Sequence, residues 1–304
     1  MLKKPFAAAL AAMVCCMLWG SAFPFIKIGY RLFDIASSDS VSQILFAGIR
    51  FLLAGILVII FGSAASKKVL VPKKESVPKV CLLSLFQTVL QYLFFYIGLA
   101  NTSGTRGSII NSTSTFFALL FSCLIFKQEK LNMQKIIGCA IGFAGVVIVN
   151  ISAGSQGSIT LAGEGFILFS AISYAVSSVL IKQFSNNENP VVLSGYQFAV
   201  GGFIMIVSGL LFGGRLTLIN TKGILLLLYL AFLSAAAYTL WGILLKYNDV
   251  SRIAVFGFMT PIFGCVFSIL FLSESFGDSG LKTILSLILV SFGIIIVNKK
   301  TKVI

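Results

Sequence analysis

A stripe of hydroxyl and amide side chains leads into an apolar stretch of the sequence. Six of the eight residues from 108 to 115 are Ser, Thr or Asn, and an apolar run starts at residue 116. At helical spacings of three and four residues, one face would carry Ser108, Asn111, Ser112, Thr115 and Ser122. A polar face inside a bilayer has to point away from lipid. The stripe therefore predicts either a hydrated cavity or a polar contact between helices.

Other apolar stretches carry polar and aromatic residues at similar spacings. We predict that they line one cavity together with Asn111 and Thr115, the residues being Trp19, Ser21, Gln87, Gln91, Tyr174, Tyr238 and Trp241. Small hydroxyl residues also allow close helix packing, so for Ser and Thr the two interpretations are nearly balanced. Buried amides need partners, which favours the cavity for Gln87, Gln91 and Asn111, and we favour it for Tyr238 as well.

Arg50 is the least favourable residue to bury, because about ten apolar or weakly polar residues flank it on either side. Insertion scales put Arg at the centre of a membrane helix at about 2.5 to 3.5 kcal/mol. One hypothesis makes Arg50 an anchor for a carboxylate or phosphate of a substrate. The alternative, which we favour, is a structural pairing with helix C-terminal carbonyls or with Asp34 or Asp39.

The sequence offers little for catalysis or metal binding. It contains no His, and its six Cys lie in apolar segments without metal-ligand spacing. No acidic residue falls deep in an apolar run, which disfavours a buried proton relay and cationic substrates. No phosphate-binding P-loop is present. We therefore predict no enzyme activity, no metal ion and no other cofactor.

These residues belong to a chain with the composition of a membrane protein. Of its 304 residues, 58% are hydrophobic and only 11% are charged, against about 25% charged in soluble domains. One span needs about 20 residues. Apolar runs of roughly that length predict ten membrane helices, near residues 5–27, 41–62, 80–100, 107–126, 136–153, 164–184, 191–212, 223–245, 253–272 and 281–298.

The net charge of +14 follows the pattern of membrane topology rather than that of a nucleic-acid surface. If the N-terminus is cytoplasmic, 16 of the 23 Lys and Arg residues lie in inner segments, as the positive-inside rule predicts. We therefore expect a multi-pass protein of the plasma or inner membrane, with both termini cytoplasmic. Its expected partners are membrane lipids and a small-molecule solute, with no nucleic acid. A monomer and a homodimer fit the sequence equally.

The two halves of the sequence repeat each other. Pairs that align at shifts of 146 or 147 residues include Arg50 and Gln197, Phe51 and Phe198, Gly55 and Gly202, and Tyr92 and Tyr238. The near-constant shift across several segments disfavours chance similarity. Each half holds five predicted spans, so the second half enters the membrane from the opposite side. We therefore predict an all-α integral membrane protein of ten transmembrane helices in two inverted five-helix repeats, residues 1–155 and 156–304.

The polar stripe has an apolar counterpart in the second repeat. Residues 108–115 align with residues 254–261, which include Phe256, Met259 and Pro261. Inverted repeats place a substrate site near the midplane, between the halves. We predict that a substrate forms hydrogen bonds near Asn111 and rests its apolar part on Phe256 and Met259. Pro261 is expected to kink its helix.

Several motifs resemble those of EamA-like members of the drug/metabolite transporter (DMT) superfamily. They are the Leu-Trp-Gly-Ser-Ala-Phe run at residues 18–23, Arg50, the Gln-Glu-Lys-Leu run at residues 128–131 and the stretch from Pro261 to Glu274. The resemblance covers nearly the whole chain and implies ten helices and export or exchange of small metabolites. Because it extends to Arg50 in members with different solutes, it favours a structural Arg50. The sequence departs from the family at Thr115 or Phe116, where a proline is often found.

We therefore expect a secondary transporter that moves a small polar or amphipathic metabolite by alternating access. Amino acids are candidate substrates, and export is the expected direction. The alternative is a flippase for lipids or lipid-linked sugars, and an intramembrane enzyme is much less favoured because the sequence lacks His and paired buried acids.

Overall fold

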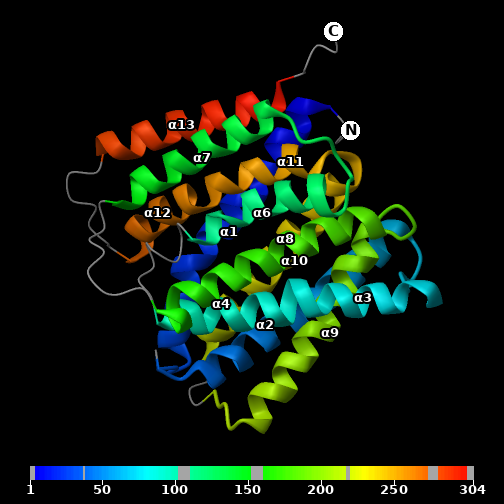
Figure 1. Ribbon diagram of the computed structural model, residues 1–304. Coiled ribbons are helices and arrows are strands. Elements are labelled where there is room, and N and C mark those ends of the chain that lie inside the picture. The colour runs from blue at the N-terminus through cyan, green and yellow to red at the C-terminus, as the bar shows by residue number, and fades with distance from the viewer. Residues whose placement is uncertain are drawn as a thin grey trace.

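The computed structural model of the chain describes residues 4–36, 38–101, 110–151, 160–216, 220–272 and 280–299. All regular secondary structure in these ranges is helical (Figure 1). Ser108, Glu274 and the predicted repeat boundary at residues 155 and 156 lie outside them. The prediction of an all-α protein is therefore confirmed for the described part of the chain.

The helices run along the chain in the order expected from the apolar runs. Those of the first half are α1 (Pro5–Leu32), α2 (Ser40–Ser66), α3 (Val77–Leu83), α4 (Gln91–Ala100), α6 (Ser114–Leu120) and α7 (Met133–Ile151), with the short segments η1 (Lys74–Ser76), η2 (Ser84–Leu90) and η3 (Phe121–Ile125). Those of the second half are α8 (Phe166–Phe184), α9 (Pro190–Leu211), α10 (Thr221–Tyr247), α11 (Val250–Ala254), α12 (Met259–Leu272) and α13 (Gly280–Asn298), with η4 (Leu161–Gly165) and η5 (Val255–Phe258).

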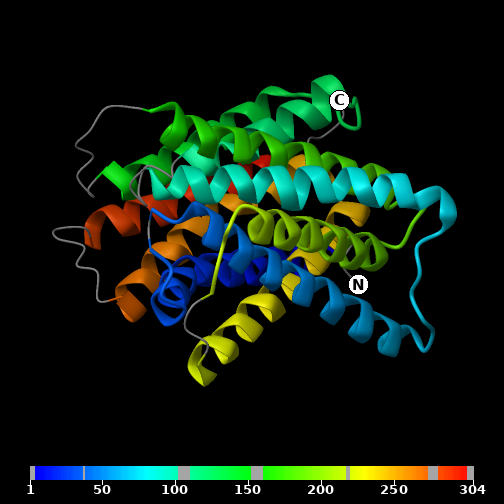
Figure 2. The ribbon, with the colours of Figure 1, turned by 90° about the horizontal axis from the view of Figure 1, so that it is seen from below.

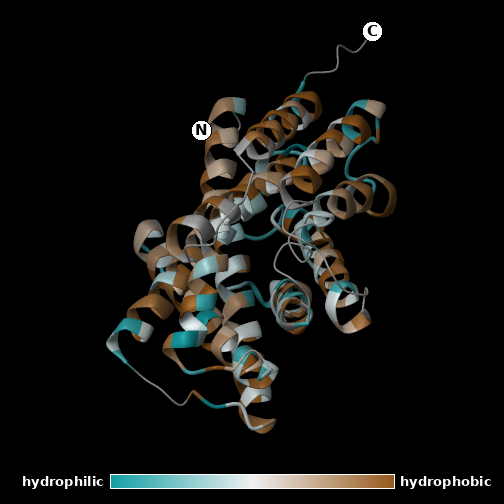
Figure 3. Ribbon diagram, turned by 90° about the vertical axis from the view of Figure 1, so that its left-hand side faces the viewer, coloured by the Kyte–Doolittle hydropathy of each residue, from teal (hydrophilic) through white to brown (hydrophobic). Residues whose placement is uncertain are grey.

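Several of these helical stretches are long and apolar enough to cross a membrane. Six qualify among the described residues: Pro5–Leu32, Ser40–Ser66, Lys74–Leu99, Leu161–Phe184, Pro190–Leu211 and Thr221–Tyr247. Four shorter apolar helices accompany them: Ile110–Ile125, Met133–Ile148, Val250–Gly264 and Leu287–Asn298. Large apolar side chains such as Phe6, Phe61 and Phe203 are exposed, and hydrophobic residues predominate along the helices (Figure 3). The chain is therefore a helical membrane protein with several membrane-spanning helices.

Helices α2 and α9 cross in close contact because glycines remove the side chains between them. A Cβ atom at Gly55 would lie 2.5 Å from the backbone nitrogen of Ala199, and one at Gly202 would lie 2.3 Å from that of Leu52. Real side chains do not approach so closely, so only glycine fits both positions. This crossing joins the first half of the chain to the second, and Figure 2 shows both helices from below.

Two membrane helices change their winding in mid-course. The π-helical segment η2 ends directly before Gln91, and the 3-10 segment η5 separates α11 from α12. Pro261 lies in the first turn of α12, where it has no N–H to donate to Gly257. Such departures from α-helical winding are common at functional sites and are tolerated at membrane depth where the backbone is buried in protein.

Candidate functional site

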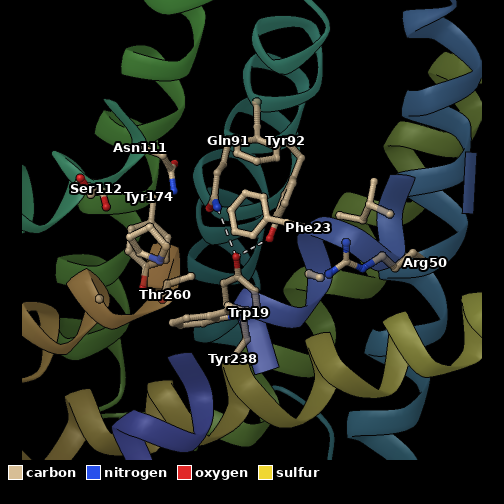
Figure 4. A pocket seen from close by; sticks show the side chains of 16 residues that line it. Trp19, Phe23, Arg50, Gln91, Tyr92, Asn111, Ser112, Tyr174, Tyr238 and Thr260 are labelled. Atoms are coloured by element: carbon tan, nitrogen blue, oxygen red, sulfur yellow. Dashed lines mark hydrogen bonds between the residues drawn. The ribbon is translucent and has the colours of Figure 1, made fainter. Parts of the chain in front are cut away.

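A cavity of about 110 Å³ lies between α1, α2, α4, α6, α8, α10, η5 and α12 (Figure 4). One buried water needs roughly 10–15 Å³, so the cavity has room for several waters or part of a small organic solute. Both halves of the chain contribute to its lining, which consists of Trp19, Ala22, Phe23, Ile26, Arg50, Gln91, Tyr92, Phe95, Asn111, Ser112, Ser114, Tyr174, Tyr238, Gly257, Thr260 and Pro261.

Aromatic rings form one wall of the cavity. Trp19 packs edge-on against Tyr174, Tyr238 and Trp241, with ring centroids 6.2, 5.0 and 4.9 Å apart. Edge-to-face contacts of this kind add to the stability that burial alone provides. Trp241 is 2% exposed and lies behind Trp19 rather than on the lining. The wall therefore presents a supported apolar surface to a solute.

A short hydrogen-bond network runs along the same wall, as the dashed lines in Figure 4 show. The hydroxyls of Tyr92 and Tyr238 are 2.5 Å apart, and Gln91 Nε2 donates to the Tyr238 hydroxyl at 3.2 Å. Gln91 Oε1 and Trp19 Nε1 are buried and have no hydrogen-bond partner in the described part of the chain. Since buried polar atoms are normally paired, these two atoms are available to a bound solute.

Arg50 reaches from α2 to α10. Its Nε and Nη2 donate to Ser234 Oγ at 3.0 and 2.8 Å, and Nε also donates to the Leu230 carbonyl at 3.3 Å. Nη1 is buried, and no described residue forms a hydrogen bond with it. The ion pairs recorded in the described part of the chain do not include Arg50. Arg50 therefore pairs with a hydroxyl and a carbonyl in the middle of α10, and not with Asp34 or Asp39 as the sequence suggested.

The structure brings seven of the thirteen predicted site residues to the cavity lining. They are Trp19, Arg50, Gln91, Asn111, Tyr174, Tyr238 and Pro261. The other six are buried but do not line it: Ser21, Gln87, Thr115, Trp241, Phe256 and Met259. Substrate binding by eleven of them, and a structural or anion-anchoring role for Arg50 and Pro261, stay predictions.

Most of the six residues away from the lining have other partners. Ser21 Oγ shares a hydrogen bond of 2.8 Å with the Tyr229 hydroxyl, and Thr115 Oγ1 donates to the Ala254 carbonyl at 3.2 Å. Phe256 and Met259 pack into the apolar core, and Gly257 and Thr260 line the cavity in their place. Gln87, four residues before Gln91, has a buried side-chain oxygen, Oε1, that accepts no hydrogen bond from the described residues.

Sequence reasoning did not select several lining residues. Phe23 and Phe95 look like ordinary core residues in an apolar sequence, and nothing in their spacing marks them. Tyr92 had a signal, because the repeat alignment pairs it with the predicted site residue Tyr238. Among the described residues, no three His, Cys, Asp or Glu side chains come together as a metal site requires.

A polar cluster joins the two halves of the chain beyond the cavity, where η3 ends and α11 begins. Glu129 accepts hydrogen bonds from Lys135 Nζ at 2.8 Å and from the Ser251 backbone N–H at 3.2 Å, and the Ser251 hydroxyl also donates to it. The Glu129 side chain is only 3% exposed. Nearby, Lys182 Nζ donates to the Asn248 carbonyl. These contacts lie at the end of the bundle near the N-terminus (Figure 1).

The long apolar helices, with their exposed hydrophobic side chains, define a helical membrane protein. Comparison with known proteins places it more closely. The model of the EamA-like transporter family matches residues 6–151 and again residues 161–299. The chain therefore belongs to the EamA-like transporter family of the DMT superfamily, and the recognition made from its motifs is confirmed.

Individual proteins that are similar to this chain are also described as transporters. An uncharacterized transporter of Archaeoglobus fulgidus is 29% identical over 85% of this chain and 86% of its own length. The uncharacterized transporter YvbV of Bacillus subtilis is 28% identical over 99% of this chain and 94% of its own. A "probable amino-acid metabolite efflux pump" of Salmonella typhimurium is 27% identical over 87% of this chain and 86% of its own length.

One solved structure, described only as the crystal structure of a protein, has a TM-score of 0.77 over 96% of each chain. Its 18% sequence identity makes it a likeness of fold alone.

Proposed function

We propose that the chain is a secondary transporter that exports small polar or amphipathic metabolites, with amino acids as the substrate class, by alternating access. The observation that carries this proposal is the cavity, which residues from both halves line and which contains buried polar atoms without partners. The relatives described as amino-acid metabolite efflux pumps, at 27% and 25% identity, support the substrate class and the direction.

The proposal includes ten spans in two inverted repeats. The family model matches the chain twice, once in each half, and six long and four shorter apolar helices are available. Contacts between aligned residues also support it, since the Phe51 and Phe198 rings stack at 5.2 Å and the Tyr92 and Tyr238 hydroxyls are 2.5 Å apart. Equivalent residues of two copies meet only near the axis that relates the copies.

Alternating access requires that one end of the cavity be closed while the other is open. The Glu129 cluster supports this, because Glu129 comes from the first half and Ser251 from the second. With both termini in the cytoplasm, this cluster would close the cytoplasmic end. A reporter fused after residue 304 is expected to report a cytoplasmic location, and an external location would overturn this topology.

Efflux from proteoliposomes tests the proposed function. Vesicles containing the purified chain are loaded with radiolabelled leucine, phenylalanine and threonine. We expect saturable efflux of at least one of them above that of protein-free vesicles. Trp19→Ala should reduce it, because it removes the centre of the aromatic wall, and Phe203→Ala, which changes an exposed ring, should not.

A lipid-translocation assay on the same vesicles distinguishes the alternative. Movement of a fluorescent lipid between leaflets without amino-acid efflux would identify a flippase. Efflux no faster than in protein-free vesicles for all three amino acids, with the protein folded, would overturn the proposed substrate class.

A further inference from the structure

Among the described residues that line the cavity, Arg50 is the one with a formal charge. It is 2% exposed, and the described part of the chain gives it no carboxylate partner. The Phe51 ring, 5.0 Å from the guanidinium carbon, offers only a weak attraction. A buried charge is unfavourable unless it is both paired and hydrogen-bonded, so the cavity lacks a negative charge at this point.

Two tyrosines beside Arg50 carry no charge that could balance it. Tyr30 Oη, like Arg50 Nη1, is buried and has no hydrogen-bond partner within the described ranges. Both Tyr30 and Tyr96 lie close enough to Arg50 to interact with it electrostatically, Tyr96 also through a side-chain hydrogen bond, and their ring centroids are 6.4 Å apart. All three groups can donate a hydrogen bond, and a guanidinium can accept none. A neutral phenol does not balance a positive charge, so the missing partner is an anionic acceptor.

We propose that Arg50 forms a carboxylate subsite of the cavity and that the substrates are monocarboxylates with an apolar body. The proposal rests on the transport function proposed above and names the chemistry that the same cavity selects. The carboxylate would accept from Arg50 Nη1, in a charge-assisted hydrogen bond. Figure 4 shows Arg50 on the side of the cavity opposite Asn111 and Tyr174. The apolar body of the substrate then lies between them, against Trp19 and Phe23.

The residue aligned with Arg50 in the second half argues against a purely structural role. Gln197 is also fully buried, and its Oε1 accepts from Thr88 Oγ1 at 2.6 Å. It is uncharged and does not line the cavity. Helix packing at this position therefore needs no charged residue. Of the two aligned residues, only Arg50 is charged, and only Arg50 borders the cavity.

The charge of the lining also predicts a selectivity order. No acidic side chain is found among the described residues of the lining, so a solute with a net positive charge would find no counter-charge there and would be repelled by Arg50. Three probes share a 3-phenylpropyl skeleton and carry a negative, a neutral and a positive head group: 3-phenylpropanoate, 3-phenylpropanamide and 3-phenylpropylamine. We expect the affinity to fall in that order, by about tenfold from the acid to the amide, as expected for one hydrogen bond to a charged group.

Intrinsic fluorescence measures this directly, since both Trp residues of the chain are at the site. Trp19 lines the cavity, and the Trp241 ring packs behind it, with the two ring centroids 4.9 Å apart. Titration of the full chain in detergent with each probe gives three affinities. Arg50→Gln should bind the acid and the amide within about twofold of each other, because the charge-assisted hydrogen bond is gone.

Gln197→Leu is the matched control, because it alters an equally buried residue at the aligned position and should keep the order of the wild type. Arg50→Lys serves as a second variant and should keep a weaker preference for the acid. A wild type that binds none of the probes, or prefers the amide or the amine, overturns the subsite. So does a folded Arg50→Gln variant that keeps the tenfold preference. Amino-acid efflux that persists in either case would leave the transport function intact, so the two proposals fail separately.

Discussion

At the scale of single residues, the polar stripe divides into groups that border the cavity and groups that do not. Asn111 lines the cavity. Ser122, on the same predicted face, is fully buried and donates to the Leu119 carbonyl at 3.0 Å. A hydroxyl that donates a hydrogen bond to a carbonyl of its own helix needs no partner from a solute. The stripe is therefore one pattern in the sequence with two structural roles.

This division predicts different effects on transport. Asn111→Ala should raise the amino-acid concentration that gives half-maximal efflux by roughly two- to tenfold, the equivalent of one hydrogen bond. Ser122→Ala should leave it within about twofold, because that hydroxyl is outside the cavity. Concentration-dependent efflux from proteoliposomes measures both. Equal effects of the two changes would argue against solute binding at Asn111.

Helical periodicity could predict part of this site but not all of it. Gln91 and Tyr238 follow from spacing and from the need of buried polar groups for partners. Phe256 was predicted to line the cavity from the aligned stretch 254–261, yet Gly257, the residue that aligns with Asn111, does so. The η5 segment winds as a 3-10 helix, which completes a turn about every 3.0 residues rather than every 3.6. Sequence spacing gives no sign of this change of winding, so it could not tell which residues of the stretch face the cavity.

At the scale of elements, the crossing of α2 and α9 depends on glycine at both contact points. A Cβ at Gly202 would lie 2.3 Å from the Leu52 nitrogen and 2.8 Å from the Gly48 carbonyl. Both neighbours are backbone atoms, so the two helices would have to separate. Gly202→Ala should therefore destabilise the protein by about 1–3 kcal/mol, as overpacking does, and lower its unfolding midpoint in detergent.

Gly165→Ala provides the control for this change. Its added Cβ would approach closely only the Leu161 side chain, at 2.8 Å, with the Thr160 carbonyl at an ordinary contact distance of 3.8 Å. Leu161 is exposed and free to rotate away. Thermal unfolding of both variants gives the comparison. Similar midpoints for Gly202→Ala and the wild type would show that α2 and α9 do not need the close approach.

A second element-scale contact lies outside the membrane spans. The Lys73 backbone N–H donates to Glu188 Oε2 at 3.1 Å, and that of Asn189 donates to Oε1 at 2.8 Å. Burial alone would raise the pKa of Glu188, but these donors and the Lys73 charge outweigh it, and the pKa lies below the ordinary 4.5. A lowered carboxyl pKa stabilises the folded state above the unfolded pKa and loses this effect as pH falls through the folded pKa.

Glu188→Gln should therefore be less stable than the wild type at neutral pH, and the difference should shrink as pH falls below 4.5. Unfolding midpoints measured between neutral pH and pH 3 test this. The exposed Glu75→Gln is the control and should follow the wild type throughout. A difference in unfolding midpoint between Glu188→Gln and the wild type that stays constant or grows in acid would contradict the assignment of these hydrogen bonds to the ionised carboxylate.

At the scale of the whole molecule, the apolar runs predicted where helices lie because a bilayer demands continuous hydrophobic segments. The runs at 41–62 and 223–245 correspond to α2 and α10. The contacts between the halves were harder to predict. Glu129 was part of a recognised motif, but its partner Ser251 lies 122 residues away, and no local pattern connects the two.

The Glu129 cluster leads to a prediction about how the whole molecule changes shape. Glu129→Gln removes the charge that holds Lys135 and weakens the bond to Ser251, so the closed end should open more often. Hydrogen bonds to a charged group suggest about a tenfold shift in that equilibrium. Cys16 can report it, because it is fully buried one helical turn before Trp19, and its Sγ donates to the Phe256 carbonyl at 3.1 Å.

The measurement uses a chain in which Cys16 is the only cysteine, reconstituted and treated with N-ethylmaleimide. Cys16 should react about tenfold faster in Glu129→Gln than in the parent chain, because opening at this end exposes the path to Trp19. Glu75→Gln removes a carboxylate that is exposed and should leave the rate unchanged. If Cys16 reacts at the parent rate in Glu129→Gln, then the cluster does not hold this end closed, and alternating access must depend on other contacts between the halves.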